Sequence, residues 1–296
     1  MQEITPIARP EGLDFGCLIV SRNGGNIFDF DKKEIVRLFK KHGALIFRGF
    51  DMDENGKNFR AFSDMFGCDF VTYPGITRDK VATDGTVQTA VKGVGAISLH
   101  QEMSYLPEPF CPSFVGFYCQ EPPIISGQTI LCDGTYVVKF LSKPAVKLLK
   151  SQPLKYEINF TIEQIMTFLR TDSLETFKKL LKKHSLRKVF SLTDDGVKTK
   201  YYTPAFTLTK FGRKKALVKP LNNFGRMQQF PVFADGSPLP PALYDELEDI
   251  TDRLTVGIRW RKGDVLLFDN SRIMHGRHSV EDDHRLIFTR FGKTTF

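Results

Sequence analysis

His100 and Glu102 stand two residues apart in the segment 97–105, Ile-Ser-Leu-His-Gln-Glu-Met-Ser-Tyr. If the backbone is extended there, both side chains lie on one face and can reach one metal ion, because side chains alternate along a strand. A second imidazole must come from far along the chain, and His275 in the segment 269–277 offers one. The fold must therefore bring these two segments together. Two His and one carboxylate on one face of an octahedron form the ligand set of non-heme Fe(II) oxygenases, with three positions left open.

The His-x-Glu motif is weak by itself, because a chain with 6 His and 34 acidic residues contains such a pair by chance. A solvated His beside a surface Glu is the alternative interpretation. His278 and His284 lie close to His275 and are rival ligands. Asp269 and Asn270 are expected to shape the adjoining turn and the ligand surroundings, because a metal-bound imidazole needs an oriented partner for its other nitrogen.

The composition favours a globular protein in a reducing compartment. The 296 residues are 41% apolar and 12% aromatic, which suffices for one large core. No apolar run reaches the length of a membrane span, and the first residues lack the basic and apolar regions of a signal peptide. The 5 cysteines form no Cys-x-x-Cys pair, which argues against a disulfide scaffold and a structural zinc site. We therefore expect a cytoplasmic location without membrane attachment.

The positive charge of the chain is concentrated in a lysine-rich insert, residues 138–219. This stretch contains 19 Lys and Arg against 6 Asp and Glu, whereas the whole chain has a net charge of +8. The simpler interpretation is a solvated surface. The other is a docking face for an acidic partner, such as a carrier protein. Nucleic acid is disfavoured because no recognition motif accompanies the charge.

Periodicity and turn residues predict a chain that is mainly β with helical additions. Helices are expected after the capping box Asp31–Glu34, around 59–66, and over 135–149 (broken before Pro144), 174–184 and 241–254. Strands are expected over 44–50, 113–120, 128–132, 155–160, 256–260, 265–268 and 286–291, with hairpins over 189–221 and a loop or lid with short strands over 68–98. Many strands with few helices indicate a jelly roll. We expect a single domain over 1–296.

Four blocks carry a more specific signal. They are Leu99–Tyr105, Phe117–Thr129 with its Glu-Pro-Pro and Ser-Gly-Gln-Thr, Trp260–Arg277 with its Met-His-Gly-Arg, and His284–Leu286. In this order and spacing the chain resembles the taurine dioxygenase/clavaminate synthase (TauD/TfdA-like) superfamily of Fe(II)- and 2-oxoglutarate-dependent oxygenases, over about residues 35 to 292. Glu in place of the more common Asp places it in the His-x-Glu subset.

The resemblance implies a double-stranded β-helix, a cupin-like jelly roll, with Fe(II) at its mouth. His100, Glu102 and His275 match the family's metal ligands, and the match of Met-His-Gly-Arg favours His275 over its rivals. Arg285 matches the family's arginine that pairs with the distal carboxylate of 2-oxoglutarate. Thr129 matches the residue whose hydroxyl helps to hold the same carboxylate. Arg290 lies near the sequence position at which taurine dioxygenase has a second arginine, which binds the acid group of taurine, and is therefore a candidate substrate-binding residue. Its spacing from Arg285 is one residue longer than in that enzyme, which reverses its facing on a strand.

The resemblance also implies the reaction: O2 and 2-oxoglutarate are consumed, succinate and CO2 are released, and an unactivated carbon of a small substrate is hydroxylated. The residues around His100 are similar to those of enzymes that act on amino acids, free or tethered to a carrier protein, in natural-product biosynthesis. Desaturation, cyclisation and epoxidation with the same cofactors are the alternatives. A non-catalytic jelly-roll binding protein is a remote alternative, because fold alone does not fix function. A zinc hydrolase is disfavoured because no carboxylate base for water is evident.

Overall fold

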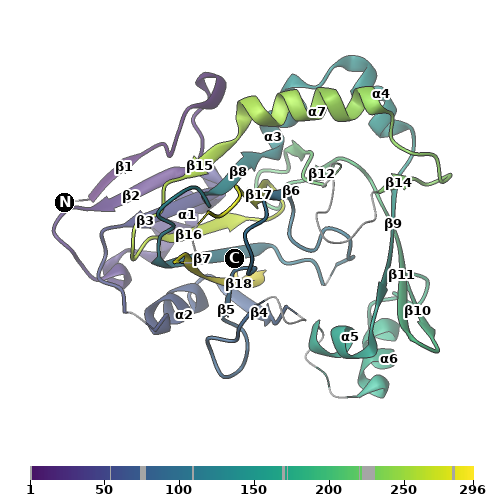
Figure 1. Ribbon diagram of the computed structural model, residues 1–296, viewed down its shortest axis with the longest axis horizontal. Helices are drawn as coiled ribbons and strands as arrows, with labels where there is room; N and C mark the ends of the chain where they lie inside the picture. The colour runs from purple at the N-terminus through teal and green to yellow at the C-terminus, as the bar shows by residue number, and fades with distance from the viewer. Residues whose placement is uncertain are drawn as a thin grey trace.

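Two β-sheets form the centre of the molecule, which we describe from a computed structural model (Figure 1). The structure describes residues 2–53, 55–73, 78–108, 110–168, 171, 173–219, 221, 231–281 and 284–296. The major sheet has the strand order β1-β2-β3-β16-β7-β18-β4, with β5 paired to β18. Its strands are β1 (Gln2–Thr5), β2 (Cys17–Ser21), β3 (Ala44–Arg48), β16 (Val265–Asp269), β7 (Phe114–Glu121), β18 (Leu286–Thr294), β4 (Gly67–Val71) and β5 (Gln88–Thr89).

The minor sheet lies against the major sheet and has the order β15-β8-β17-β6. Its strands are β15 (Val256–Ile258), β8 (Thr129–Asp133), β17 (Ile273–Arg277) and β6 (Ile97–His100). Its pairings are all antiparallel, and in the major sheet only the β2–β3 pair is parallel. The predicted jelly roll is confirmed.

One apolar core fills the space between the two sheets. It joins Phe117, Leu266 and Phe268 of the major sheet to Leu131 and Ile273 of the minor sheet. Strand β16 is buried along its whole length. Leu266 and Phe268 face this core, whereas Val265 and Leu267 face a second core on the other side of the major sheet. A strand buried on both faces reads as a continuous apolar run, which is what Val-Leu-Leu-Phe is.

Helices and a Phe-rich core cover the other face of the major sheet. Helix α1 (Lys32–His42) begins at Asp31, whose side chain accepts a hydrogen bond from the Lys33 N–H. The predicted capping box is only half formed, because Glu34 pairs with Arg37 at 2.6 Å instead. Helix α2 (Lys57–Asp64) buries Phe59 and Phe62 in the same core. Short 3₁₀ helices lie at Pro10–Gly12 and Ile27–Asp29.

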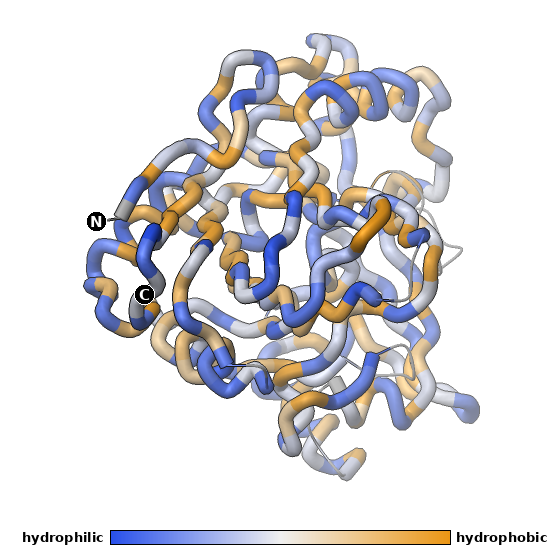
Figure 2. Tube along the Cα trace, turned by 60° about the vertical axis from the view of Figure 1, so that its left-hand side comes forward, coloured by the Kyte–Doolittle hydropathy of each residue, from blue (hydrophilic) through white to orange (hydrophobic). Residues whose placement is uncertain are grey.

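A third layer lies on the outer face of the minor sheet. Its helices are α3 (Gly134–Phe140), α4 (Lys143–Ser151) and α7 (Pro241–Leu254). The predicted break of the first helix falls at Ser142, whose side chain caps α4. Helix α7 packs Leu243, Leu247, Ile250 and Leu254 into a core shared with Cys132 and Met274 of the minor sheet. Figure 2 shows this amphipathic character as blue and orange alternating along the helix at the top.

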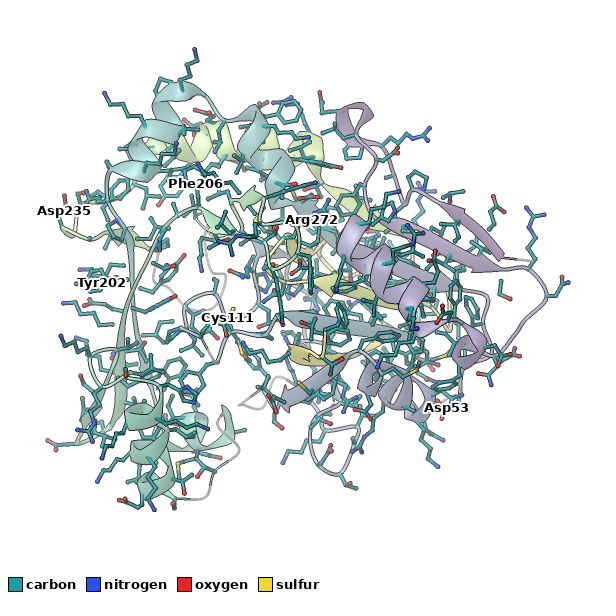
Figure 3. The ribbon with its side chains drawn as sticks, turned by 180° about the vertical axis from the view of Figure 1, so that it is seen from behind. Asp53, Cys111, Tyr202, Phe206, Asp235 and Arg272 are labelled. Carbon is teal, nitrogen blue, oxygen red and sulfur yellow. The ribbon has the colours of Figure 1, made fainter. Side chains whose placement is uncertain are left out.

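The lysine-rich stretch contributes a separate sheet, on the right of Figure 1, with the order β10-β11-β9-β14. The elements of this region are β9 (Leu154–Phe160), α5 (Ile162–Phe168), α6 (Leu174–Lys183), β10 (Phe190–Thr193), β11 (Gly196–Thr203), β12 (Thr207–Leu208), β13 (Lys215–Ala216) and β14 (Val232–Phe233). Figure 3 shows Tyr202 of β11 on its outer side, where it is 45% exposed. No helix among the described residues is long and apolar enough to cross a membrane.

Candidate metal centre and co-substrate site

Two neighbouring strands bring the imidazoles of His100 and His275 together. His100 ends β6, His275 is the central residue of β17, and the antiparallel register pairs the two residues directly. Their ring centroids lie 4.3 Å apart. Since β17 is hydrogen-bonded to β8 on its other side, the position of His275 is fixed by the sheet.

Glu102 lies in the turn after β6 and is held there by Asn270. The Glu102 N–H donates to Asn270 Oδ1 at 2.9 Å, and Asn270 Nδ2 donates to the Glu102 carbonyl at 3.0 Å and to the Pro112 carbonyl at 2.7 Å. All these groups are buried. The next residue, Met103, has a left-handed backbone with φ of 54°, which redirects the chain after the turn. The Glu102 carboxylate is thereby aimed at both imidazoles, with Oε2 3.5 Å from His275 Nε2 and 4.0 Å from His100 Nε2.

His100 and Glu102 are in the protonation states that metal binding requires. His100 Nδ1 donates to the Ser98 carbonyl at 2.9 Å, because a carbonyl can only accept, and the neutral ring therefore carries its lone pair on Nε2, the atom nearer to Glu102. Burial, together with the nearby His275, lowers the pKa of His100 to about 4. Burial opposes ionisation of Glu102, but the adjacent His275 and His100 outweigh it and hold the pKa of Glu102 at about 2. A neutral imidazole and an ionised carboxylate are the forms that bind a divalent cation.

The arrangement fits one metal ion. Ligand atoms of His100, Glu102 and His275 all lie within 4.8 Å of one another, and they form the only such group among the described His, Cys, Asp and Glu residues. Glu102 Oε2 is buried and has no hydrogen-bond partner. A buried carboxylate oxygen without a partner is costly, and a bound cation removes that cost. Two His and one carboxylate suit Fe(II) with open positions for co-substrates.

The rival imidazoles lie elsewhere. His278 and His284 are both exposed, whereas the side chain of His275 is 8% exposed. His278 follows β17 and lines a cavity of about 880 Å³ beside α7, on the outer face of the minor sheet. Neither residue belongs to the convergent group of ligand atoms.

Asp269 shapes the turn between β16 and β17, as expected, by accepting bonds from the Ser271 N–H and hydroxyl at 2.8 and 2.6 Å. The expectation that this pair would orient an imidazole is wrong. Asn270 holds the Glu102 backbone, and His275 Nδ1 has no hydrogen-bond partner within the described structure. Instead the His275 ring packs against Phe117 and Phe268, at centroid distances of 5.6 and 5.3 Å. Packing, not hydrogen bonding, orients this ring.

Arg285 lies just before β18 and lines a cavity of about 310 Å³ together with Arg277 and residues 89–94. Asp79 also lines this cavity, and its carboxylate is paired with Lys92 at 2.7 Å. Arg285 Nε donates to the Gly127 carbonyl at 3.2 Å. Desolvation, together with the nearby cations Arg277 and Arg78, lowers the pKa of Arg285 to about 10. A half-buried guanidinium that is repelled by two others favours an anion in this cavity. The shape and charge suit a carboxylate.

Thr129 starts β8 and is paired in register with Arg277 of β17. Its hydroxyl accepts a hydrogen bond from Trp260 Nε1 at 3.0 Å, and its side chain is buried. The hydroxyl hydrogen remains available to an acceptor such as a carboxylate. Trp260 thus fixes the position of Thr129.

Arg277 was not singled out by the sequence, although it lies two residues after His275. Its guanidinium donates to the carbonyls of Val91, Gly93 and Gly95 at 2.7, 2.7 and 2.6 Å. These contacts fasten the loop that covers the Arg285 cavity. The period of a strand could have suggested that residues 275 and 277 share a face, but the carbonyls it meets could not be foreseen.

Arg290 does not meet the triad. Its Nη1 donates to the Arg60 carbonyl, Ser63 Oγ and Asp64 Oδ1 at 2.9, 2.8 and 2.7 Å, all on α2, and its guanidinium stacks on Phe70. This placement agrees with the spacing argument, because one extra residue after Arg285 turns the side chain to the helical side of the sheet.

The loop expected over 68–98 supplies two groups near the triad that the sequence did not identify, Tyr73 and Arg78. The hydroxyl of Tyr73 lies 3.2 Å from that of Tyr105, which follows Glu102 by three residues. The guanidinium of Arg78 lies over the Tyr73 ring, 4.8 Å from its centroid. Aromatic spacing gave no signal here, because the loop has no regular period.

Comparisons with known proteins agree with this geometry. A model of the family described as taurine catabolism dioxygenase TauD, TfdA matches residues 9–291. A clavaminate synthase-like protein from Arabidopsis thaliana is 26% identical over 86% of this chain and 83% of its own length, and the dapdiamide synthesis protein DdaC from Enterobacter agglomerans is 20% identical over the same shares. The structure of PvcB from Pseudomonas aeruginosa, described as an Fe, alpha-ketoglutarate dependent oxygenase from an isonitrile synthetic pathway, superposes with a TM-score of 0.58 at 15% identity, covering 99% of this chain and 91% of that one.

The family match covers nearly the whole chain and includes all three residues of the triad. The predicted cofactors, Fe(II), 2-oxoglutarate and O2, are those of the family. The chain therefore belongs to the taurine catabolism dioxygenase TauD, TfdA family and is a 2-oxoglutarate-dependent dioxygenase.

Proposed function

We propose that His100, Glu102 and His275 hold Fe(II), that Arg285 and Thr129 bind 2-oxoglutarate, and that the enzyme hydroxylates an unactivated carbon of a small, amino-acid-like substrate. The observation that carries this proposal is the convergence of three ligand atoms with a carboxylate oxygen that has no other partner. Bound iron supplies the oxidising power through O2 and the decarboxylation of 2-oxoglutarate to succinate. The chain positions the co-substrate and excludes water from a buried site.

Glu102 supports oxygen transfer as the outcome. A carboxylate ligand occupies a metal position that chloride takes in the related halogenases, which lack it. The buried hydrogen bonds of Asn270 fix the backbone of Glu102, which keeps its carboxylate beside the two imidazoles, where it would bind the metal. Desaturation, cyclisation or epoxidation with the same cofactors would use the same site and remain the alternatives that product analysis separates.

The expectation of an amino-acid-like substrate is supported by the kind of relative that the chain resembles, since one is a protein of dapdiamide synthesis. The tethered version of the proposal adds an acidic carrier protein. Helix α6 of the lysine-rich stretch supports it, because Lys178, Lys179, Lys182 and Lys183 are all exposed on one short helix. A surface of this charge attracts an acidic partner and accelerates its association.

The binding of an acidic carrier protein is tested by reversing the charge of two lysines on α6. We expect Lys179→Glu with Lys183→Glu to weaken turnover of an amino acid loaded on an acidic carrier by about tenfold, because rim charges act mainly on association. Turnover of the same free amino acid should not change. If free amino acids are oxidised and no loaded carrier is bound or oxidised, the tethered version fails and the metal chemistry stands.

We also propose that residues 1–296 form one oxygenase domain and that it works in the cytoplasm. The core on the outer face of the minor sheet supports the first point, because it contains Leu154 and Phe177 of the lysine-rich stretch as well as Met274 beside the triad. The cytoplasmic location is supported by the cysteines, because all five are free thiols and a reducing compartment keeps thiols free. Limited proteolysis that released a stable fragment containing 138–219 would contradict a single domain.

The function is tested by succinate release from 2-oxoglutarate in the presence of a metabolite panel. We expect succinate formation that depends on one class of amino-acid-like compound, with one oxygen atom added to the product. His100→Ala and His275→Ala should abolish this activity, while the exposed His278→Ala should retain it. Substrate-dependent succinate formation by either of the first two variants would remove that residue from the ligand set.

A further inference from the structure

Several arginines of the barrel that are shielded from water have partners within the protein, whereas Arg285, which the proposed function assigns to 2-oxoglutarate, has no carboxylate partner among the described residues. Arg48 pairs with Asp264 at 2.6 Å, Arg272 with Asp133 at 2.7 Å, and the guanidinium of Arg277 meets three loop carbonyls. Such matching is expected, because a buried cation without a partner is costly. An unmatched arginine in the same environment therefore points to a ligand.

Arg78 is such an arginine. It is half buried, and no carboxylate of the described residues lies within 4.0 Å of it. Its Nη1 donates to Thr289 Oγ1 at 3.1 Å, whereas its Nε is buried and has no hydrogen-bond partner. A guanidinium carries five N–H donors in a planar fork. Most of these N–H groups have no hydrogen-bond acceptor among the described residues.

The guanidinium is held in a defined orientation. It stacks against the rings of Tyr73 and Phe291, with centroid distances of 4.8 and 5.1 Å. Stacking on two aromatic faces leaves the edge of the fork, where the N–H groups point, free to meet a planar anion. The orientation of Arg78 is thus fixed before an anion binds, unlike that of a mobile surface arginine.

The fork lies close to the triad, because the charge of Arg78 contributes to lowering the pKa of both Glu102 and His100. Thr289, which it touches, is paired in register with Phe117, and the Phe117 ring is 5.6 Å from the ring of His275. Tyr73, on which it stacks, meets Tyr105 three residues after Glu102. Contacts of Arg78 therefore reach both sides of the metal centre.

Arg78 is separate from the co-substrate cavity. The residues that line that cavity include Arg285 and Arg277 but not Arg78. If 2-oxoglutarate uses the metal and Arg285, as in the proposed function on which this inference rests, its two carboxylates are accounted for. A second free guanidinium then requires a second anion.

We propose that Arg78 binds a carboxylate of the primary substrate and so selects an acidic substrate. The carboxylate would accept two parallel hydrogen bonds from the fork, with Tyr73 and Tyr105 on one side. This narrows the tethered version of the function. An amino acid on a carrier has its α-carboxylate in the thioester, so only an amino acid with an acidic side chain could satisfy Arg78 in that form.

The proposal is tested with acetate on the enzyme loaded with Mn(II) and N-oxalylglycine, an inert analogue of 2-oxoglutarate. Isothermal titration should show acetate binding but no binding of the neutral isostere acetamide. Arg78→Met should weaken acetate binding by about tenfold or more, because a charge-assisted bidentate contact is lost. Arg78→Lys should restore part of it, and Arg37→Met, an exposed arginine of α1, should change nothing.

The outcomes are distinct. Failure of wild-type protein to bind Mn(II) and N-oxalylglycine contradicts the proposed function itself. Normal loading with no acetate binding, or with equal acetate binding in Arg78→Met, overturns the role of Arg78 alone. Loss of N-oxalylglycine binding in Arg78→Met would assign Arg78 to the co-substrate and likewise overturn the proposal.

Discussion

Asn270 shows how much one side chain can decide in this site. It satisfies both backbone groups of Glu102 and the Pro112 carbonyl, all of them buried. The three candidate ligands, His100, Glu102 and His275, could be named from the sequence, because the residue types of ligands and their spacing are visible there, and the structure brings the three side chains together. The sequence predicted that Asn270 lies near the site, but not that it holds Glu102. The partners of Asn270 are backbone groups of a turn that forms only in the folded chain.

Asn270→Ala should therefore weaken both the fold and the site. We expect unfolding in urea to show a loss of about 3 kcal/mol, because buried N–H and carbonyl groups lose their partners. The Mn(II) affinity should fall by about 10- to 100-fold, as for other residues that orient a ligand. Asn159→Ala, at an exposed position of β9, is the control. Unchanged stability and affinity would show that Asn270 is not what holds Glu102.

The low pKa of His100 predicts a stability that depends on pH. In the metal-free protein the folded state holds this pKa at about 4, below the usual 6.5. The unfolded chain then takes up the proton first, so stability falls as pH drops from 6.5 toward 4. Between pH 7 and 4.5 the metal-free wild type should lose about 2 kcal/mol more than His100→Gln in urea unfolding. Equal losses would contradict a buried neutral imidazole.

Strand β17 carries His275, yet it was not predicted as a strand. Its sequence, Ile-Met-His-Gly-Arg, has neither alternation nor a run of β-branched residues, and all five residues are buried. It is a strand because β8 and β6 pair with it on both sides. Helix α1 and strand β16 were predicted, because an apolar stripe and an apolar run are local signals. Pairing with distant strands leaves no such signal.

Arg272 ties several of these elements together, as Figure 3 shows between α1 and α3. It pairs with the buried Asp133 at the start of α3 and donates to the Lys41 carbonyl in the last turn of α1. Asp133 also caps α3 through the Thr135 N–H at 2.8 Å. One ion pair thus links β17, α3 and α1.

Arg272→Met should destabilise the protein by about 3 to 5 kcal/mol, because it leaves Asp133 buried without its charge partner. Thermal and urea unfolding would measure this. Arg22→Met removes the exposed pair with Glu3 and should leave stability unchanged. If the two variants unfold alike, the buried pair does not join the elements as described.

Over the whole molecule, the number of strands and their turns predicted a jelly roll, and this is confirmed. The strand order was not predictable, since neighbours such as β3 and β16 are separated by more than two hundred residues. In the lysine-rich stretch the sequence predicted the strand 155–160 and hairpins over 189–221, but not that β9 would pair with β11 and β14 in one sheet. The sequence identified the site because its ligands are rare residue types, whereas the scaffold depends on long-range packing.

Binding at the proposed centre should stabilise the whole chain. Mn(II) with N-oxalylglycine, at about 100 times the dissociation constant, should raise the free energy of unfolding by about 3 kcal/mol, because the unfolded chain cannot assemble the site. Chelation by EDTA should reverse the gain. Glu102→Ala should show none of it, and a full gain in that variant would mean that the ions bind elsewhere.

The most direct test is an anaerobic titration of the metal-free protein with Fe(II) and then 2-oxoglutarate, followed by visible absorption. The wild type should develop the weak charge-transfer band of an iron chelate at one equivalent of each. Glu102→Ala and His275→Ala should lack it, and Arg285→Gln should need about tenfold or more 2-oxoglutarate to reach it, because the guanidinium fork is lost. A wild-type protein that binds Fe(II) and 2-oxoglutarate without this band, or a Glu102→Ala variant that shows it in full, would contradict the assignment of this triad as the iron site.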